Sequence, residues 1–276
     1  MTAREPAAIA PIVTLRPLAD ADRATAAALL DRLGAARARL ADPADATARE
    51  RGWTLRIDGL SRVLTRPDGA RLAIDFTAGR NAARAREGDL AGQPLARAIG
   101  LSRLRRRLGR PPTVVDATAG LGGDAWVFAA LGCSVTLIER EPLVHTLLEA
   151  ALGRAAATAA TSELAARVRL LDGEATARLA TLERAAADVV YLDPMYPPTR
   201  RRAAAGKGMQ FLHELLDEET DDDGALLGAA LGAAGHRVTV KRPKGAPPLA
   251  GDAAFDGQRS TIASPTTRYD VYHVAR

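Results

Sequence analysis

Residues that could bind and orient an amine follow a short apolar run late in the chain. The run DVVYL (188–192) leads straight into Asp193 and Pro194, and Tyr196 comes two residues later. A carboxylate there can accept a hydrogen bond from an exocyclic amine. The carbonyl oxygen of Pro194 can do the same, because the proline ring holds its backbone rigidly. Tyr196 offers a ring on which a planar base can stack. We therefore predict Asp193, Pro194 and Tyr196 as catalytic residues.

Such a site would act mainly by positioning its substrate. An amine on an aromatic ring needs little deprotonation before it attacks a methyl donor, since its proton can leave late. The four histidines are scattered, so none is an obvious base and none has metal-ligand spacing. The alternative reading is that D-P-x-Y is only a turn that ends a strand, because the motif is weak by itself.

A second motif, VVDATAGLGGDAWVFAALG, predicts a ligand cradle between a strand and a helix. Asp116 ends the strand, and Asp124 is expected to cap the helix. The glycines between them let the backbone turn tightly and approach a ligand; they are Gly120, Gly122 and Gly123. A purely structural turn and a dinucleotide dehydrogenase remain alternatives. The pattern is not G-x-G-x-x-G, however, and it has no P-loop lysine.

The acid that ends the next strand indicates which cofactor the cradle holds. Glu139 lies 23 residues after Asp116, where an acid can accept both ribose hydroxyls of an adenosine. S-adenosylmethionine has an adenosine and no pyrophosphate, and its cationic groups suit Asp116 and Asp124 as neighbours. Glu174 and Ala175 follow a third strand and could line the adenine pocket, although an ordinary turn explains them equally well.

Strand and helix patterns alternate from about residue 90 onward, which predicts a parallel sheet with helices on both faces. The expected fold is α/β, a Rossmann-like class I methyltransferase sheet with a small N-terminal α+β region. We expect strands at 113–116, 134–140, 167–173, 188–192, 236–243 and 267–274, and helices at 95–109, 124–132 and 142–157.

The predicted domains are 1–85 for the α+β region and 86–276 for the methyltransferase domain. Within the first, we expect a helix over 20–40 and two strands, 53–64 and 71–76. The turn RPDG (66–69) would join these strands.

Composition points to a soluble, cytoplasmic protein with a polyanionic partner. The chain has 276 residues, a net charge of +5 and a pI of about 9.8. Of its 38 basic residues only three are lysines, and arginine is the better bidentate partner for phosphate. No apolar run is long enough to span a membrane, and the N-terminus is a poor signal peptide. The single cysteine, Cys133, is expected to be a buried structural thiol. Candidate contacts to such a polyanion are Arg200, Arg201, Arg202, Lys207, Lys241 and Arg242.

Three segments, DATAGLGGDAWVFAALGCSVTLIER, VVYLDPMYPP and VTVKRPKGAPPLA, together resemble the RsmJ family. This family comprises bacterial small-subunit ribosomal RNA methyltransferases that make N2-methylguanine in 16S rRNA from S-adenosylmethionine. The similarity runs from about Leu72 to the C-terminus. The resemblance implies cofactor contacts at Gly123, Asp124, Glu139, Arg140, Glu174, Ala175 and Asp193. The family often has arginine in place of Gly123 and serines in place of Glu174 and Ala175.

The residues alone leave two other functions open. D-P-x-[FY] serves guanine and adenine alike, so an N6-adenine or other exocyclic-amine methyltransferase on DNA or RNA fits them too. A non-catalytic RNA-binding protein on the same scaffold is the third reading, although a pure binder has no need of Asp193, Pro194 and Tyr196 together. We expect a monomer.

Overall fold

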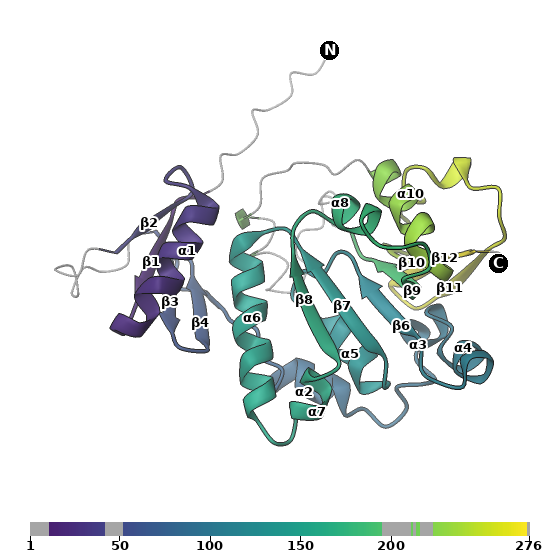
Figure 1. The fold of residues 1–276 in the computed structure, drawn as a ribbon, viewed down its shortest axis with the longest axis horizontal. Helices are drawn as coiled ribbons and strands as arrows, with labels where there is room; N and C mark the ends of the chain where they lie inside the picture. Colours follow the sequence, from purple (N-terminus) through teal and green to yellow (C-terminus); the bar gives the residue numbers. More distant parts are fainter. Residues whose placement is uncertain (1–10, 42–51, 195–210, 212–213, 216–222, 275–276) are drawn as a thin grey trace, which may run out of the picture. The chain divides into compact units, whose positions relative to one another are not determined.

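The computed structural model describes residues 11–41, 52–194, 211, 214–215 and 223–274. The chain divides into two compact units (Figure 1). The first comprises residues 1–74, 141–151 and 197–220, and the second residues 75–140, 152–196 and 221–276. The domain boundary at residue 85 stays a prediction.

The first unit contains a five-stranded sheet of order β2-β1-β3-β4-β5. Its strands are β1 (Val13–Pro17), β2 (Ala38–Leu40), β3 (Trp53–Asp58), β4 (Ser61–Thr65) and β5 (Arg71–Leu72). A 3-10 turn, η1 (Asp20–Asp22), leads into helix α1 (Arg23–Leu33). Leu15, Leu55 and Leu64 are fully buried from three neighbouring strands, so this small sheet has a core of its own.

Two predictions in this unit were wrong in detail. The helix predicted over 20–40 ends at Leu33, because Gly34 adopts φ 73°, and the chain then forms β2. The single strand predicted over 53–64 is a hairpin, β3 paired with β4, that turns at Gly59 (φ 53°). The turn RPDG does join antiparallel strands, β4 and β5, as predicted.

The second unit is built on a seven-stranded sheet of order β11-β12-β10-β9-β6-β7-β8. The strands are β6 (Thr113–Asp116), β7 (Ser134–Glu139), β8 (Val168–Asp172), β9 (Ala187–Leu192), β10 (Ala234–Pro243), β11 (Arg259–Ala263) and β12 (Thr267–His273). The strands from β10 to β8 pair in parallel, as predicted. The edge strands β12 and β11 are antiparallel, and β11 was not predicted from the sequence.

Helices lie on both faces of this sheet (Figure 1). They are α2 (Gly79–Ala85), α3 (Pro94–Ala98), α4 (Leu101–Leu108), α5 (Gly123–Ala130), α7 (Ser162–Ala165), α8 (Ala175–Ala180) and α10 (Asp223–Ala233). A further helix, α6 (Pro142–Ala157), has residues in both units, and a 3-10 turn, η4 (Asp252–Ala254), precedes β11. The basic helix predicted over 95–109 is two helices, since Gly100 (φ 68°) separates α3 from α4.

The two faces differ in chemistry, and this difference places the polar residues. Val190, Leu192 and Val240 lie on the face that packs with α8 and α10 in the hydrophobic core. Side chains alternate along a strand, so Tyr191 and Lys241 lie on the other face. That face is covered by α5: the Phe128 ring contacts the Tyr191 ring edge-on, with centroids 5.1 Å apart. The face toward α5 therefore carries polar groups at the carboxyl end of the strands.

Among the described residues, no helix is long and apolar enough to cross a membrane. Cys133 is fully buried, as predicted, and burial raises the pKa of its thiol to about 12. It is therefore a protonated core residue at neutral pH.

Candidate active site

The predicted acids end neighbouring parallel strands of the second unit. Asp116 is the last residue of β6, Glu139 the last of β7, and Asp193 follows β9 directly. Since β9, β6 and β7 are adjacent and parallel, the three acids lie at one edge of the sheet. This carboxyl-terminal edge is where ligands bind in open α/β sheets.

Lys241 connects two of the predicted carboxylates. Its Nζ lies 2.7 Å from Asp193 Oδ2 and 2.9 Å from Asp124 Oδ2. Lys241 comes from β10, Asp193 from the turn after β9, and Asp124 from the first turn of α5. One ammonium group thus joins the glycine-rich cradle to the D-P turn.

Three side chains contact the Asp124 carboxylate. Besides Lys241, it accepts a hydrogen bond from the Tyr191 hydroxyl at 2.6 Å, and Arg84 Nη1 of α2 lies 2.7 Å from its Oδ1. Burial alone would raise the pKa of Asp124, but Lys241 and Arg84 lower it to about 2. Asp124 is therefore a buried, ionised group at neutral pH, held by two cations and a hydroxyl.

The same contacts shift the pKa values of Lys241 and Asp193. Burial disfavours the charged form of Lys241, yet Asp124 and Asp193 outweigh this and raise its pKa. Burial also raises the pKa of Asp193; the nearby Asp124 carboxylate adds to this rise, while Lys241 opposes it. Lys241 therefore stays protonated, and its charge holds Asp193 closer to the ionised form.

The structure differs from three predictions made from the sequence, for Asp124, Lys241 and Arg242. Asp124 does not cap α5, because Gly122 is the N-cap and Asp124 is the second residue of the helix, with its carboxylate paired to Lys241. Lys241 was predicted to contact RNA phosphate, but its ammonium is engaged by two carboxylates. Arg242 is also buried, and its Nε donates to the carbonyl oxygen of Pro247, so it does not offer a free surface guanidinium.

The glycine-rich turn has the conformation that its sequence predicts. Gly120 and Gly122 have φ angles of 50° and 71°, which other residues adopt at a cost. The turn places the N–H of Gly120 2.9 Å from Glu139 Oε2. Gly123 opens α5, and a side chain there would approach Asn81 Oδ1 at 3.4 Å. The cradle and the acid after β7 are thus held together by a direct hydrogen bond.

Asp116 and Asp193 are connected through Thr118. The backbone N–H of Thr118 donates to Asp116 Oδ1 at 3.2 Å, and its hydroxyl accepts from the backbone N–H of Asp193. Asp116 is 2% exposed. Burial, with the charge of Asp124 nearby, raises its pKa well above the usual range. Acids with strongly shifted pKa values cluster at functional sites.

The remaining predicted residues lie at the same edge or outside the described residues. Glu174 is the N-cap of α8, where its Oε2 accepts from the N–H of Ala177 at 2.8 Å, and Ala175 begins that helix. Arg140 follows Glu139 and is exposed. Pro194 is buried beside Asp193. Tyr196, Arg200, Arg201, Arg202 and Lys207 lie outside the described residues.

Sequence reasoning missed Arg84 and Tyr191, and it misassigned Lys241. Tyr191 had a signal, because it is two residues before Asp193 on a strand and so shares its face. Lys241 also had one, as a lysine in a chain that uses arginine almost everywhere. Arg84 had none, since its helix is distant in sequence from the motif that it contacts.

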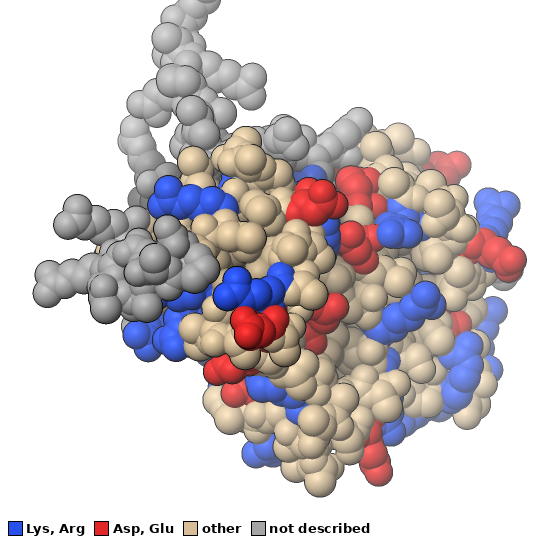
Figure 2. All heavy atoms as spheres, turned by 60° about the vertical axis from the view of Figure 1, so that its left-hand side comes forward, with Lys and Arg blue, Asp and Glu red and all other residues tan. Residues whose placement is uncertain are grey.

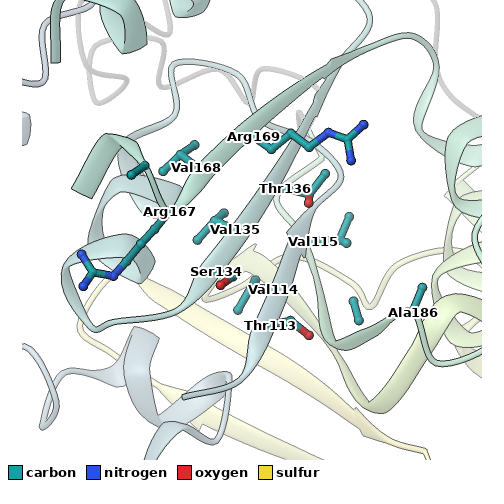
Figure 3. A pocket seen from close by; sticks show the side chains of 12 residues that line it. Thr113, Val114, Val115, Ser134, Val135, Thr136, Arg167, Val168, Arg169 and Ala186 are labelled. Atoms are coloured by element: carbon teal, nitrogen blue, oxygen red, sulfur yellow. The ribbon is translucent and has the colours of Figure 1, made fainter. Parts of the chain in front are cut away.

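A separate pocket opens at the opposite edge of the sheet (Figure 3). Thr113, Ser134 and Val168 line it, and each is the first residue of its strand. The acids of the candidate active site lie at the other ends of these strands or of their neighbours, so this pocket is separate from that site.

The comparisons with known proteins agree with this geometry. Residues 53–274 match the family model described as "Putative SAM-dependent methyltransferase". A crystal structure of a SAM-dependent methyltransferase from Neisseria gonorrhoeae superposes with a TM-score of 0.66 at 29% identity, covering 95% of each chain. The match confirms the Rossmann-like class I fold predicted from the sequence.

Two curated relatives carry the name ribosomal RNA small subunit methyltransferase J. The protein from Chromohalobacter salexigens is 46% identical over 207 residues, which are 74% of this chain and 77% of that protein. The one from Thioalkalivibrio sulfidiphilus is 44% identical over 216 residues, 78% of this chain and 81% of that protein. The chain therefore belongs to the SAM-dependent methyltransferases, in the family of the ribosomal RNA small subunit methyltransferases J.

Proposed function

We propose that this protein is an S-adenosylmethionine-dependent methyltransferase that methylates the exocyclic N2 of a guanine in 16S ribosomal RNA. The observation that carries the proposal is the placement of Asp193. It lies at the carboxyl edge of the sheet, in the turn D-P, and Lys241 ties it to Asp124 of the glycine-rich cradle. A site for a methyl donor and a site for an amine would thus adjoin.

The residues at this edge fit S-adenosylmethionine. Glu139, aligned by the N–H of Gly120, is the group we assign to the ribose hydroxyls. The buried Asp116 would face the cationic part of the cofactor, and Glu174 and Ala175 would flank the adenine. The remaining proposed contacts are Gly120, Gly122, Gly123, Asp124, Arg140 and Asp193. The cofactor, when bound, supplies an electrophilic methyl group.

Three residues would hold the target amine. One N–H of the amine donates to the Asp193 carboxylate, and the other donates to the carbonyl oxygen of Pro194. Tyr196 stacks on the base. With both N–H groups held, the nitrogen lone pair points away from Asp193 and Pro194, and positioning supplies most of the rate enhancement. As the N–CH3 bond forms, the nitrogen becomes acidic, and Asp193 or water accepts its proton.

The choice of guanine over adenine rests on the family. An Asp-Pro turn can hold the –NH2 of either base, but the named relatives act on ribosomal RNA of the small subunit. The base must leave its stack to reach Asp193, which is common to enzymes that do chemistry on nucleobases.

Arginine side chains close in sequence to this turn would hold the RNA backbone. Arg200, Arg201, Arg202 and Lys207 follow Asp193 within 14 residues, and phosphate contacts supply affinity rather than sequence information. On the face in Figure 2, basic side chains form several separate groups with acidic ones among them. We place the enzyme in the cytoplasm with its ribosomal substrate, and as a monomer.

The proposal is tested by identifying the methylated nucleoside. The protein is incubated with S-adenosylmethionine labelled in its methyl group and with small ribosomal subunits that lack the modification. The RNA is then digested and the labelled nucleoside identified. We expect N2-methylguanosine. Label in N6-methyladenosine would agree with the mechanism but would contradict guanine as the target base. Cofactor binding without any methyl transfer would favour a non-catalytic RNA-binding protein.

A further inference from the structure

Lys241 stands out because of the composition of the chain. Only three of the 38 basic residues are lysines, so arginine is the default cation here. Arginine presents a planar fork, whereas lysine is a compact point charge with three donors that can be aimed separately. A lysine in this position suits two carboxylates that approach from different directions.

The two carboxylates come from different parts of the proposed site. Asp124 belongs to the helix that follows the glycine-rich cradle, and Asp193 to the turn proposed to hold the amine. Both oxygens are within hydrogen-bond distance of one nitrogen. Asp124 is anchored further by Arg84 and Tyr191, whereas the Asp193 carboxylate has Lys241 as its one ion-pair partner among the described residues.

We propose that Lys241 is a positioning residue that holds the Asp193 carboxylate, ionised and oriented, against the fixed Asp124. The inference rests on the proposed function and adds a residue to it. Lys241 does not touch the reacting atoms. It acts through Asp193, because only an ionised, correctly aimed carboxylate can accept both a lysine and an amine.

The strand pairing supports this role. β10 and β9 run parallel with Val240 opposite Leu192, so Lys241 follows the end of β9 in register with the turn. On its other side, Lys241 pairs with Tyr269 of β12. A residue fixed between two strands keeps its Cα in place, so the ammonium position is set by the sheet rather than by a loop.

Removing the ammonium would leave two neighbouring carboxylates with less compensation. Repulsion from Asp124 would then favour the protonated form of Asp193. Protonated Asp193 is a poorer acceptor for the amine hydrogen bond than the carboxylate. As the pH is lowered, the variant would therefore lose methyl transfer at a higher pH than the wild type does. Removing Asp124 instead would have the opposite effect, because Lys241 would then serve Asp193 alone.

The experiment measures the pH dependence of methyl transfer in single turnover at saturating S-adenosylmethionine. The variants are Lys241→Met, Lys241→Arg and Asp124→Asn, with Lys244→Met as the matched control. Lys244 is exposed beyond the end of β10. Thermal unfolding and cofactor affinity are recorded for each variant.

In Lys241→Met we expect the midpoint of the acid limb to rise by about one pH unit or more. The rate above the new midpoint should recover, which a merely structural defect would not allow. Lys241→Arg keeps the charge and should keep the midpoint near that of the wild type, even if its rate is lower. Asp124→Asn should lower the midpoint, so the inference can be tested even if Lys241→Met does not fold.

Two results would overturn the inference. The first is that the wild type is active and that the wild type, Lys241→Met and Lys244→Met all have the same pH midpoint. The second is a midpoint that does not fall in Asp124→Asn. A wild type that binds the cofactor but transfers no methyl group would overturn the proposed function as well, so the two failures can be told apart.

Discussion

Single residues of the site stabilise one another's charges at the carboxyl edge of the larger sheet. Asp124 and Asp193 share the ammonium of Lys241, and Asp124 has Arg84 as a second cation. Burying the charge of Asp124, which is 9% exposed, without these partners would cost several kcal/mol. The acids were predictable from the sequence, because Asp193 ends an apolar run and Asp124 follows the glycine-rich turn. The pairing of these acids with Arg84 and Lys241 was not predictable, since the two cations lie 40 and 117 residues from Asp124 in the sequence.

Asp116→Asn tests the role of the acid whose pKa is raised most clearly. A raised pKa in the folded state means that the stabilisation from this acid is present at low pH and is lost as the pH rises through the folded-state pKa. Asparagine does not ionise, so the variant does not lose this stability as the pH rises. We expect Asp116→Asn to melt at a higher temperature than the wild type, by more at pH 8 than at pH 5, and to bind S-adenosylmethionine more weakly. Thermal unfolding and calorimetry measure the two effects.

Asp188→Asn is the control for that experiment. Asp188 lies at the other end of β9, where Arg110 and Thr113 contact its carboxylate at 2.7 Å. Burial opposes ionisation of Asp188, but these contacts lower its pKa. Its loss should destabilise the protein at neutral pH and leave cofactor affinity unchanged. If Asp116→Asn gives the same pattern as Asp188→Asn, Asp116 has only a structural role.

At the scale of elements, the alternation of side chains along the strands places core residues on one face of the sheet and site residues on the other. Val190 and Leu192 enter the core under α8 and α10, while Tyr191 and Asp193 lie on the α5 face. The central strands and α6 were predictable because their apolar patterns are long and regular. The edge strand β11 was not, since RSTIA is mostly exposed and carries no alternating apolar signal. The breaks at Gly34, Gly59 and Gly100 depend on single glycines that sequence patterns do not distinguish from ordinary ones.

Alanine substitutions at two glycines with nearly the same backbone conformation can distinguish backbone strain from an effect on cofactor binding. Gly122 before α5 has φ 71° and ψ 11°, and Gly109 after α4 has φ 68° and ψ 4°. Alanine in this left-handed region costs about 1–2 kcal/mol. We expect Gly122→Ala and Gly109→Ala to lower the free energy of unfolding by similar amounts. Only Gly122→Ala should weaken S-adenosylmethionine binding, as calorimetry would show. Equal cofactor affinity in the two variants would remove the turn from the cofactor site.

At the scale of the whole molecule, the chain combines a unit that contains the proposed active site with segments whose proposed function is supported only by their composition and position in the sequence. The larger unit contains every described residue of the proposed site. The arginines proposed to hold RNA lie outside the described residues, so the argument for them is their position after Asp193 and their charge. The sequence predicted this cluster, and it also predicted Lys241 and Arg242 as RNA contacts. In the structure the Lys241 ammonium is paired with two carboxylates, and Arg242 is buried.

Changing Arg200, Arg201 and Arg202 together to alanine should weaken RNA binding and make it less dependent on salt. Each phosphate contact contributes roughly one unit to the slope of log K against log salt concentration. The matched variant changes Arg105, Arg106 and Arg107, which are exposed on α4, and removes the same charge. We expect the larger loss of affinity in the first variant and unchanged cofactor binding in both. Equal losses would indicate attraction by net charge rather than a grip near the target base.

The measurement that tests the central claim most directly is the single-turnover rate of methyl transfer in Asp193→Asn, at saturating S-adenosylmethionine. Asparagine keeps the size of the side chain and removes the charge that the amine and Lys241 require. Losing one such positioning group costs about 100-fold or more in rate. We predict a loss of that order, with cofactor affinity reduced by a much smaller factor. A rate close to that of the wild type, or a loss explained entirely by weaker cofactor binding, would contradict the assignment of Asp193 as the residue that holds the amine.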